Sequence, residues 1–188
     1  MLLASTGVPS VSAQNPDRDP WELVLTNEEA AGKASLLMAE EECSDERARC
    51  VHKRWERDIE TDAALGPGIT DTHVWVARDV ERAKAIYRDQ EKLQRTMPEG
   101  VESANGPFKW EAPRPPVAEE WTGANACERD RCEQPGVINL HQRVVARTDN
   151  VVSVVYLWGR SRNSTPELAV YYTTRIMQRV NPPAEPAE

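Results

Sequence analysis

The sequence lacks the features that mark membrane-spanning and nucleic-acid-binding proteins. No apolar run in its 188 residues approaches the roughly 18 residues that a membrane-spanning helix needs. Acidic residues outnumber basic ones by 31 to 23, and the net charge is −8. The arginines alternate with acids instead of forming a basic stripe. We therefore expect no transmembrane segment in this chain and no nucleic-acid partner.

Motifs of enzymes and cofactor sites are also missing. No phosphate-binding loop occurs, and no serine or cysteine lies in a motif that would pair it with His52, His73 or His141 as a nucleophile. Zinc is an alternative, because His52 follows Cys50 closely and His141 follows Cys132. The gaps within the two cysteine pairs, six and four residues, fit a compact zinc knuckle poorly. The sequence thus predicts no catalytic residue, no metal site and no cofactor.

Four cysteines form two tight pairs, Cys43 with Cys50 and Cys127 with Cys132. Each pair encloses a short charged loop, so every cysteine has a partner within reach, and we predict two local disulfides. Crossed pairing of the same four cysteines stays open, because the sequence does not separate the possible connectivities. Disulfides persist in oxidising compartments, so the pairs favour an extracytoplasmic location, either secreted or at the cell surface.

Both ends of the chain are expected to be flexible. Val11-Ser12-Ala13 has the small-residue spacing of a signal-peptidase site, so residues 1–19 are interpreted as a flexible leader or the remnant of a signal peptide. The Pro-rich residues 181–188 are interpreted as a flexible tail. We expect one α+β domain over residues 20–180.

Helical and strand patterns alternate within this domain. Thr26-Asn-Glu-Glu29 is a capping box that predicts a helix running toward Met38. Strict alternation of side chains predicts a strand over Thr70–Ala77. Asp79 is a typical N-cap before a helical apolar pattern that extends to about Thr96. A strand that leads directly into a helix is therefore expected in the middle of the chain.

A β-hairpin is the clearest secondary structure in the sequence. β-Branched runs over Val137–Arg147 and Asn150–Trp158 predict two paired strands. Alternation in the first run predicts one buried face and one solvent-exposed face, with His141, Arg143 and Arg147 on the solvent-exposed face. The second run is more continuously apolar, so we expect it near the centre of the sheet.

The remaining segments complete an α+β arrangement. A long surface connection is expected over the Pro-rich segment Pro98–Pro116, which contains Trp110, and a short strand is expected around Glu120-Trp121. Ser164-Thr-Pro-Glu167 is a second capping box, and it predicts a last helix through Val180. In chain order the expected elements are a helix, a strand, a helix, a long loop, a short strand, a hairpin and a last helix.

The order of these elements resembles the PsbP-like fold, which recurs in exported bacterial lipoproteins and in extracellular sensor domains of bacterial serine/threonine kinases. Three stretches carry the likeness: Thr72–Ala77 leading into Asp79–Leu93, Glu119-Glu-Trp121 before the hairpin, and Arg147-Thr-Asp-Asn-Val-Val152 before the amphipathic helix that begins at Ser164. The likeness spans the whole expected domain. It implies a central antiparallel sheet flanked by N-terminal, middle and C-terminal helices. It also implies a binding or accessory module rather than an enzyme, and it leaves the ligand open.

Two groups of side chains are candidates for ligand contact. His141 and Arg143 are interpreted as an anion- or ligand-contacting pair, and Trp75, Trp110 and Trp121 offer the large apolar faces that suit carbohydrate or peptide clefts. Ordinary roles on the surface and in the core stay open for the same residues. The sequence favours a non-enzymatic ligand-binding or sensor-like domain for an unknown small molecule, glycan or envelope protein. A cell-envelope structural or protein-interaction module is the alternative, and an unrecognised hydrolase is the third interpretation.

Overall fold

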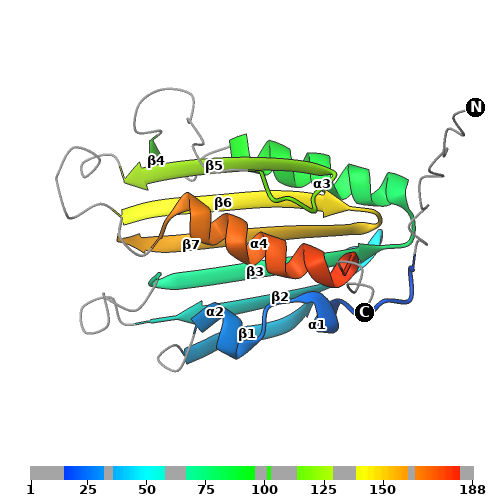
Figure 1. Ribbon diagram of the computed structural model, residues 1–188, viewed down its shortest axis with the longest axis horizontal. Coiled ribbons are helices and arrows are strands. Elements are labelled where there is room, and N and C mark those ends of the chain that lie inside the picture. The colour runs from blue at the N-terminus through cyan, green and yellow to red at the C-terminus, as the bar shows by residue number, and fades with distance from the viewer. Residues whose placement is uncertain are drawn as a thin grey trace, which may run out of the picture.

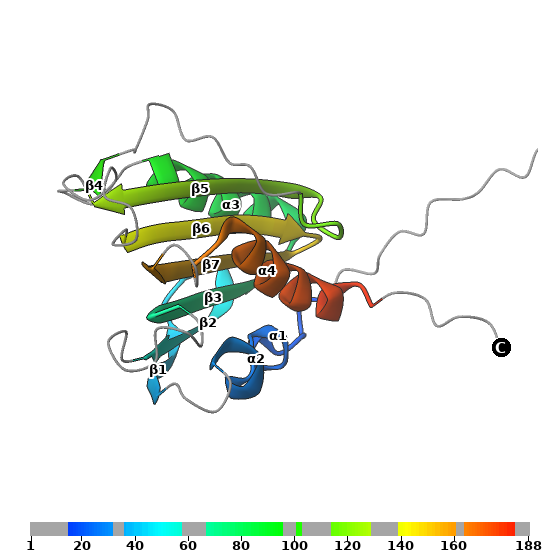
Figure 2. The same ribbon diagram turned by 60° about the vertical axis from the view of Figure 1, so that its left-hand side comes forward.

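A computed structural model of the chain shows an α+β architecture, as the sequence predicts. Its described residues form one antiparallel sheet of seven strands, with helices on both faces (Figures 1 and 2). No helix in this part of the chain is long and apolar enough to cross a membrane. The structure describes residues 15–31, 36–57, 67–95, 101–102, 114–128, 139–160 and 164–182.

The sheet consists of two antiparallel meanders joined in the middle. Strands β1, β2 and β3 pair in succession, as do β5, β6 and β7, and the short β4 pairs with β5. The meanders meet where β3 pairs with β7, and this pairing puts β7 at the centre of the sheet, as predicted. In chain order the elements are α1 (Pro20–Leu23), α2 (Asn27–Ala31), β1 (Leu36–Cys43), β2 (Ala48–Glu56), β3 (Ile69–Ala77), α3 (Val80–Arg95), β4 (Val101–Glu102), β5 (Glu120–Glu128), β6 (Asn139–Thr148), β7 (Val151–Arg160) and α4 (Pro166–Val180).

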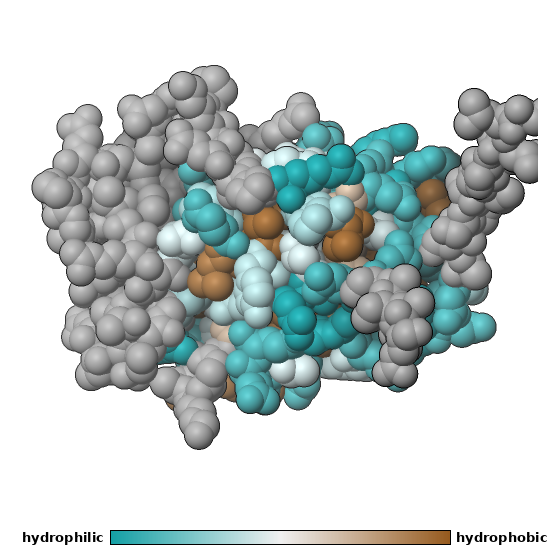
Figure 3. Space-filling model, in the orientation of Figure 1, coloured by the Kyte–Doolittle hydropathy of each residue, from teal (hydrophilic) through white to brown (hydrophobic). Residues whose placement is uncertain are grey.

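The larger core lies on the face of the sheet that carries α1, α2 and α4. Figure 1 shows these helices in front of the strands, and apolar side chains come to the surface there only in separate spots (Figure 3). Ile176 and Met177 of α4 and Trp55 of β2 are almost fully buried in this core. The Trp55 indole N–H donates to the Asn27 side chain at 2.9 Å, so the buried indole is satisfied.

The smaller core lies on the other face, beneath α3. Ala83, Ile86 and Tyr87 of this helix pack against apolar side chains of β3, β6 and β7. The prediction that this face of the hairpin is exposed to solvent is therefore wrong: Val145 of β6 is fully buried, and Arg147 is only 4% exposed. The sequence pattern shows which side chains of a strand share a face, but not whether a distant helix covers that face.

The predicted helix from Thr26 toward Met38 is also wrong in its length. Its start is correct, because Thr26 and Glu29 make the reciprocal capping bonds, but α2 ends at Ala31. The following segment forms β1, which begins at Leu36 and pairs with β2. Leu, Met, Ala and Glu favour helices, so pairing with β2 outweighs local propensity in this segment.

The two later helix starts follow the predicted cap chemistry closely. Asp79 accepts a hydrogen bond from the Arg82 backbone N–H at 2.8 Å, as an N-cap should. The last helix is capped by Thr165, whose hydroxyl accepts from the Leu168 N–H at 3.2 Å. Its cap is thus one residue later than the predicted capping box at Ser164, which instead lies fully buried.

The β6–β7 turn is anchored to the end of β3. Asp149 has a positive φ of 53°, a left-handed conformation that Asp tolerates better than most residues. The neighbouring Asn150 is buried, and its side-chain amide donates to the Ala77 carbonyl at 2.7 Å. The turn therefore helps to hold the two meanders in register.

One of the two predicted disulfides is present among the described residues. Cys43 and Cys50 face each other across β1 and β2, and the bond closes the hairpin between these strands. The second predicted pair cannot be placed, because Cys132 lies outside the described residues. Most of the predicted leader and tail also lies outside them, although Asp19 caps α1 through the Trp21 N–H.

Candidate ligand-binding surface

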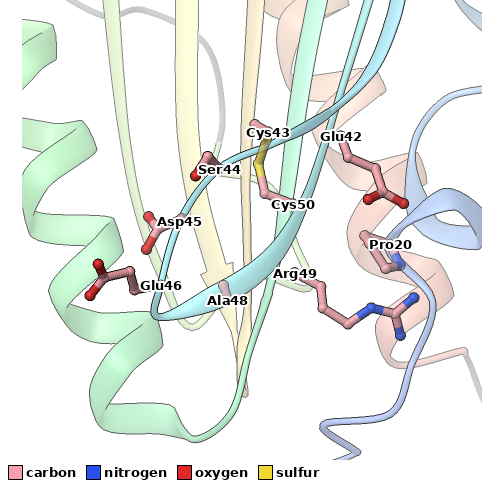
Figure 4. A pocket seen from close by; sticks show the side chains of 9 residues that line it. All are labelled: Pro20, Glu42, Cys43, Ser44, Asp45, Glu46, Ala48, Arg49 and Cys50. Carbon is pink, nitrogen blue, oxygen red and sulfur yellow. A yellow bond between two sulfur atoms is a disulfide. The ribbon is translucent and has the colours of Figure 1, made fainter.

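A hollow of about 320 Å³ lies beside the β1–β2 hairpin. Figure 4 shows Asp45 and Glu46 on the side of α3, and Glu42 and Arg49 on the side of Pro20. Two of these charged residues, Asp45 and Arg49, already pair with Arg47 and Asp19. A hydrogen bond from Arg47, helped by its charge, holds the pKa of Asp45 below the ordinary value despite burial. None of the ligand-contacting residues predicted from the sequence lines this hollow, so it is a weak candidate.

A more promising group of side chains lies on the α3 side of the sheet. Strand alternation places Asp71 of β3, Tyr156 of β7 and Arg143 of β6 on this face. They form one row across three neighbouring strands, because Asp71 is opposite Tyr156 and Tyr156 is opposite Arg143. We call these three residues the polar row.

The predicted pair His141 and Arg143 meets Tyr156 in this row. His141 Nδ1 lies in hydrogen-bond contact with the Tyr156 hydroxyl, and the Trp158 ring lies 6.4 Å from the His141 ring. The Arg143 guanidinium donates to Gln90 of α3 at 2.8 Å. Burial lowers the pKa of Arg143, while the negative charge of Asp71 and the Tyr156 side chain oppose this effect. A cation is therefore held in a partly desolvated position beside a hydroxyl and an imidazole.

A second group adjoins the polar row at Asp71. His52 of β2 is directly opposite His73 of β3, and their rings stack at 4.1 Å with an angle of 9° between planes. Asp71 Oδ1 lies 3.0 Å from His52 Nε2 and 3.2 Å from His73 Nε2. Burial alone would raise the pKa of Asp71, but the hydrogen bonds and charges of the two histidines outweigh it and lower that pKa. We call His52, Asp71 and His73 the histidine cluster.

The predicted tryptophan residues do not gather in one place. Trp75 lies on the α3 side and is 7% exposed, and its ring stacks on His73 at 5.4 Å. Trp121 packs against the core on the opposite face of the sheet. Trp110 lies outside the described residues. Of these three tryptophans, only Trp75 adjoins the histidine cluster in the part of the chain that the structure describes.

Sequence reasoning missed Tyr156 and the histidine cluster. His52 lies in a charged segment that was not predicted as a strand, so its pairing with His73 was not foreseen. One signal was present: Asp71 and His73 are two residues apart in a predicted strand, a spacing that puts both side chains on one face. The pairing that brings His52 to them depends on the tertiary structure.

Comparison with known proteins supports the fold and goes no further. No protein-family model matches the sequence, and no curated protein matches it. Among solved structures, the extracellular domain of PknH from Mycobacterium tuberculosis matches with a TM-score of 0.59. The two chains share a fold. The match covers 89% of this chain and 96% of that domain at 12% sequence identity, and it does not test the finer resemblance to the PsbP-like family.

Proposed function

We propose that this chain is an exported, non-enzymatic sensor-like domain that binds a small molecule or glycan on the α3 side of its sheet. The polar row is the observation that carries this proposal, because it sets a cation, a hydroxyl and a carboxylate side by side on three strands. The fold shared with an extracellular domain supports a sensor-like role. The Cys43–Cys50 disulfide is typical of oxidising compartments and supports export.

Arg143 is the residue we expect to contact an anionic group of the ligand. A guanidinium binds carboxylates and phosphates through several N–H groups at once, and partial burial strengthens such a contact. Tyr156 and His141 supply hydrogen-bonding groups next to it, and Trp158 supplies an apolar face. These features suit a polar ring or chain that carries a negative charge, and we assign no catalytic role to any of them.

The proposal is tested by ligand screening with a matched pair of variants. The oxidised protein would be screened by thermal shift against sugars, peptidoglycan fragments, lipids and peptides. We expect anionic compounds to raise the Tm of the wild-type protein, and Arg143→Gln to reduce that rise. Arg49→Gln should behave like the wild type, because Arg49 is half exposed and pairs with Asp19 at 3.3 Å. A panel in which no compound shifts the Tm would contradict the proposal.

The edge strand β1 supports a second candidate function, a protein-interaction module of the cell envelope. Leu36 is 72% exposed and Met38 is 56% exposed, which is unusual for large apolar side chains on an edge strand. A partner strand added to this edge would cover them. Cross-linking in envelope extracts, repeated with Met38→Lys, would test this function, because a specific partner should be lost with the charged variant.

A further inference from the structure

The histidine cluster has the composition of a metal site. Imidazole nitrogens and a carboxylate oxygen are common ligands of zinc, and imidazole also suits copper and nickel. One ligand atom from each of His52, Asp71 and His73 lies within 4.8 Å of the other two. The sequence alone predicts no metal site, because these ligands come from two strands whose pairing it does not show.

The backbone fixes the three ligands well. β2 pairs with β1 and β3, and β3 pairs with β2 and β7, so neither strand is an edge of the sheet. His52 and His73 form a direct cross-strand pair, and Asp71 projects from the same face two residues before His73. Ligands on paired interior strands hold their geometry better than ligands on loops.

The spacing of the ligand atoms fits a small divalent ion. In a tetrahedral zinc site, bonds of about 2.0–2.2 Å place ligand atoms about 3.3–3.6 Å apart. Asp71 Oδ1 is already 3.0 Å from His52 Nε2 and 3.2 Å from His73 Nε2. To admit the ion, these two separations must grow by a few tenths of an ångström, and the stacked His52 and His73 rings must turn so that their Nε2 lone pairs converge.

Glu41 of β1 supplies an outer partner of the kind that metal-bound histidines have. Its carboxylate lies 3.1 Å from His52 Nδ1, on the opposite side of the ring from Asp71. A metal at Nε2 requires the remaining ring proton on Nδ1, and Glu41 can accept a hydrogen bond from an N–H at that position. This hydrogen bond favours the metal-binding tautomer of His52, whereas the contact between Asp71 and Nε2 favours the other tautomer when no metal is bound.

The cluster is reachable from solvent. The side chains of His52 and Asp71 are 14% and 16% exposed, and that of His73 is 32% exposed. Three protein ligands leave one tetrahedral position for water or for a ligand atom. The competing interpretation is a network in which two histidines and an acid only stabilise the strands through hydrogen bonds.

We propose that His52, Asp71 and His73 form a binding site for one divalent transition-metal ion of the zinc, copper or nickel class. This site goes beyond the proposed function: it shares Asp71 with the polar row, but it does not depend on the ligand of that row. Magnesium and calcium are poor candidates, since they prefer ligand sets made only of oxygen.

Isothermal titration calorimetry on untagged, oxidised protein tests the site. Residual thiols would be alkylated and metal removed with a chelator before titration with zinc, nickel or magnesium chloride. We expect one zinc ion per chain, with nickel also bound and magnesium not. His73→Gln and Asp71→Asn should each weaken zinc binding at least tenfold, and Glu41→Gln about tenfold. The matched control His141→Gln removes another histidine of the same face and should bind zinc as the wild type does.

Each result of this experiment decides the proposal. Absence of zinc and nickel binding, binding of magnesium alone, or equal loss in His73→Gln and His141→Gln would overturn it. Imidazole nitrogen resonances of the wild-type protein give an independent answer if a variant fails to fold. Zinc should shift the resonances of His52 and His73 and leave those of His141 in place. Because the ligand panel for the polar row uses no metal, failure of either proposal leaves the other intact.

Discussion

Glu29 connects three parts of the molecule through one carboxylate. It accepts the Thr26 backbone N–H at 2.9 Å and so completes the cap of α2. It also forms ion pairs with Arg175 and Arg179 of α4. Arg179 in turn donates to the Leu23 carbonyl at 2.8 Å. The N-terminal helices are thus tied to the last helix by charge as well as by the core.

The pKa of Glu29 makes this link sensitive to acid. Burial alone would raise that pKa, but the Thr26 N–H and the two arginines outweigh burial and lower it from 4.5 to about 2. The folded state therefore takes up the proton at lower pH than the unfolded state does. The stabilisation is complete above about pH 4.5 and is lost as the pH falls toward 2.

We expect Glu29→Gln to lower the free energy of unfolding at neutral pH by about 1–2 kcal/mol, a value reduced for partial exposure. Urea denaturation between pH 2 and 7 measures this loss, and the difference between variant and wild type should shrink as the pH falls. The matched variant Glu28→Gln alters an exposed neighbour and should change little. Equal curves for the two variants would show that the ion pairs contribute nothing.

Arg147 is the charged residue whose burial is least expected from its position in the sequence. It is only 4% exposed, and it pairs with Glu119 at 2.6 Å and donates to the Asp149 carbonyl at 2.6 Å. Burial alone would lower the pKa of Arg147, but Glu120 and Glu119 outweigh it, so the pKa is raised. Its charge therefore persists in the folded protein and joins β5 to the β6–β7 turn.

Arg147→Met keeps the length of the side chain and removes its hydrogen bonds. We expect thermal or urea unfolding to show a loss of about 1–3 kcal/mol, because several charge-assisted bonds disappear. Arg49→Met removes an exposed ion pair and should cost less than about 0.5 kcal/mol. Stability of Arg147→Met equal to that of the wild type would mean that the solvated glutamates compensate fully.

At the scale of elements, the β1–β2 hairpin depends on its disulfide because packing holds β1 only weakly. β1 is an edge strand, and its Leu36, Leu37 and Met38 side chains are exposed, so little apolar burial holds it in place. The Cys43–Cys50 bond supplies a constraint that packing does not. It also fixes the register that places Glu41 beside His52.

Replacing both cysteines with alanine should lower the free energy of unfolding by about 2–2.5 kcal/mol, because the closed loop is short. Denaturant unfolding of the variant and of the oxidised wild-type protein, both without reductant, measures this loss. Local hydrogen exchange in β1 should rise in the same variant, and that in β7 should not. A variant with unchanged β1 exchange would indicate that the hairpin forms without the bond.

The sequence predicts well those elements whose signals are local. The strand at Thr70–Ala77, the Asp79 cap and the last helix were all found from alternation and cap residues. It fails where a segment lacks a strand pattern of its own: β1 contains helix-favouring residues, and four of the nine residues of β2 are Lys, Arg or Glu. β1 is a strand because it pairs with β2, and β2 is held between β1 and β3.

The residues of the candidate site differ in the same way: some have a local signal in the sequence and others do not. His141 and Arg143 were identified because their strand was identified, and the structure adds Tyr156 as the group between Arg143 and Asp71. The histidine cluster could not be predicted from the sequence, because it requires the pairing of β2 with β3. A contact between side chains of two strands can be predicted from a sequence only when both strands and their register are known.

At the scale of the whole molecule, protection of the backbone should be highest at the centre of the sheet. β7 lies between β3 and β6, and α3 and α4 cover its two faces. We expect hydrogen exchange of its amides only through global unfolding, with the slowest rates in β7 and its neighbours. Rates in β1 that match those in β7 would contradict this order of stability.

The junction between the two meanders has a consequence for the speed of folding. Each meander pairs strands that are close in the sequence, whereas the β3–β7 junction joins Ile69–Val76 to Val151–Trp158. Closing such a long loop costs chain entropy before any contact repays it. Each meander should form early, and their union should limit the rate at which the protein emerges from its unfolded state. A chain that has both halves but not the junction would expose two unpaired strand edges, so oxidation of the β1–β2 hairpin must compete with aggregation during that interval.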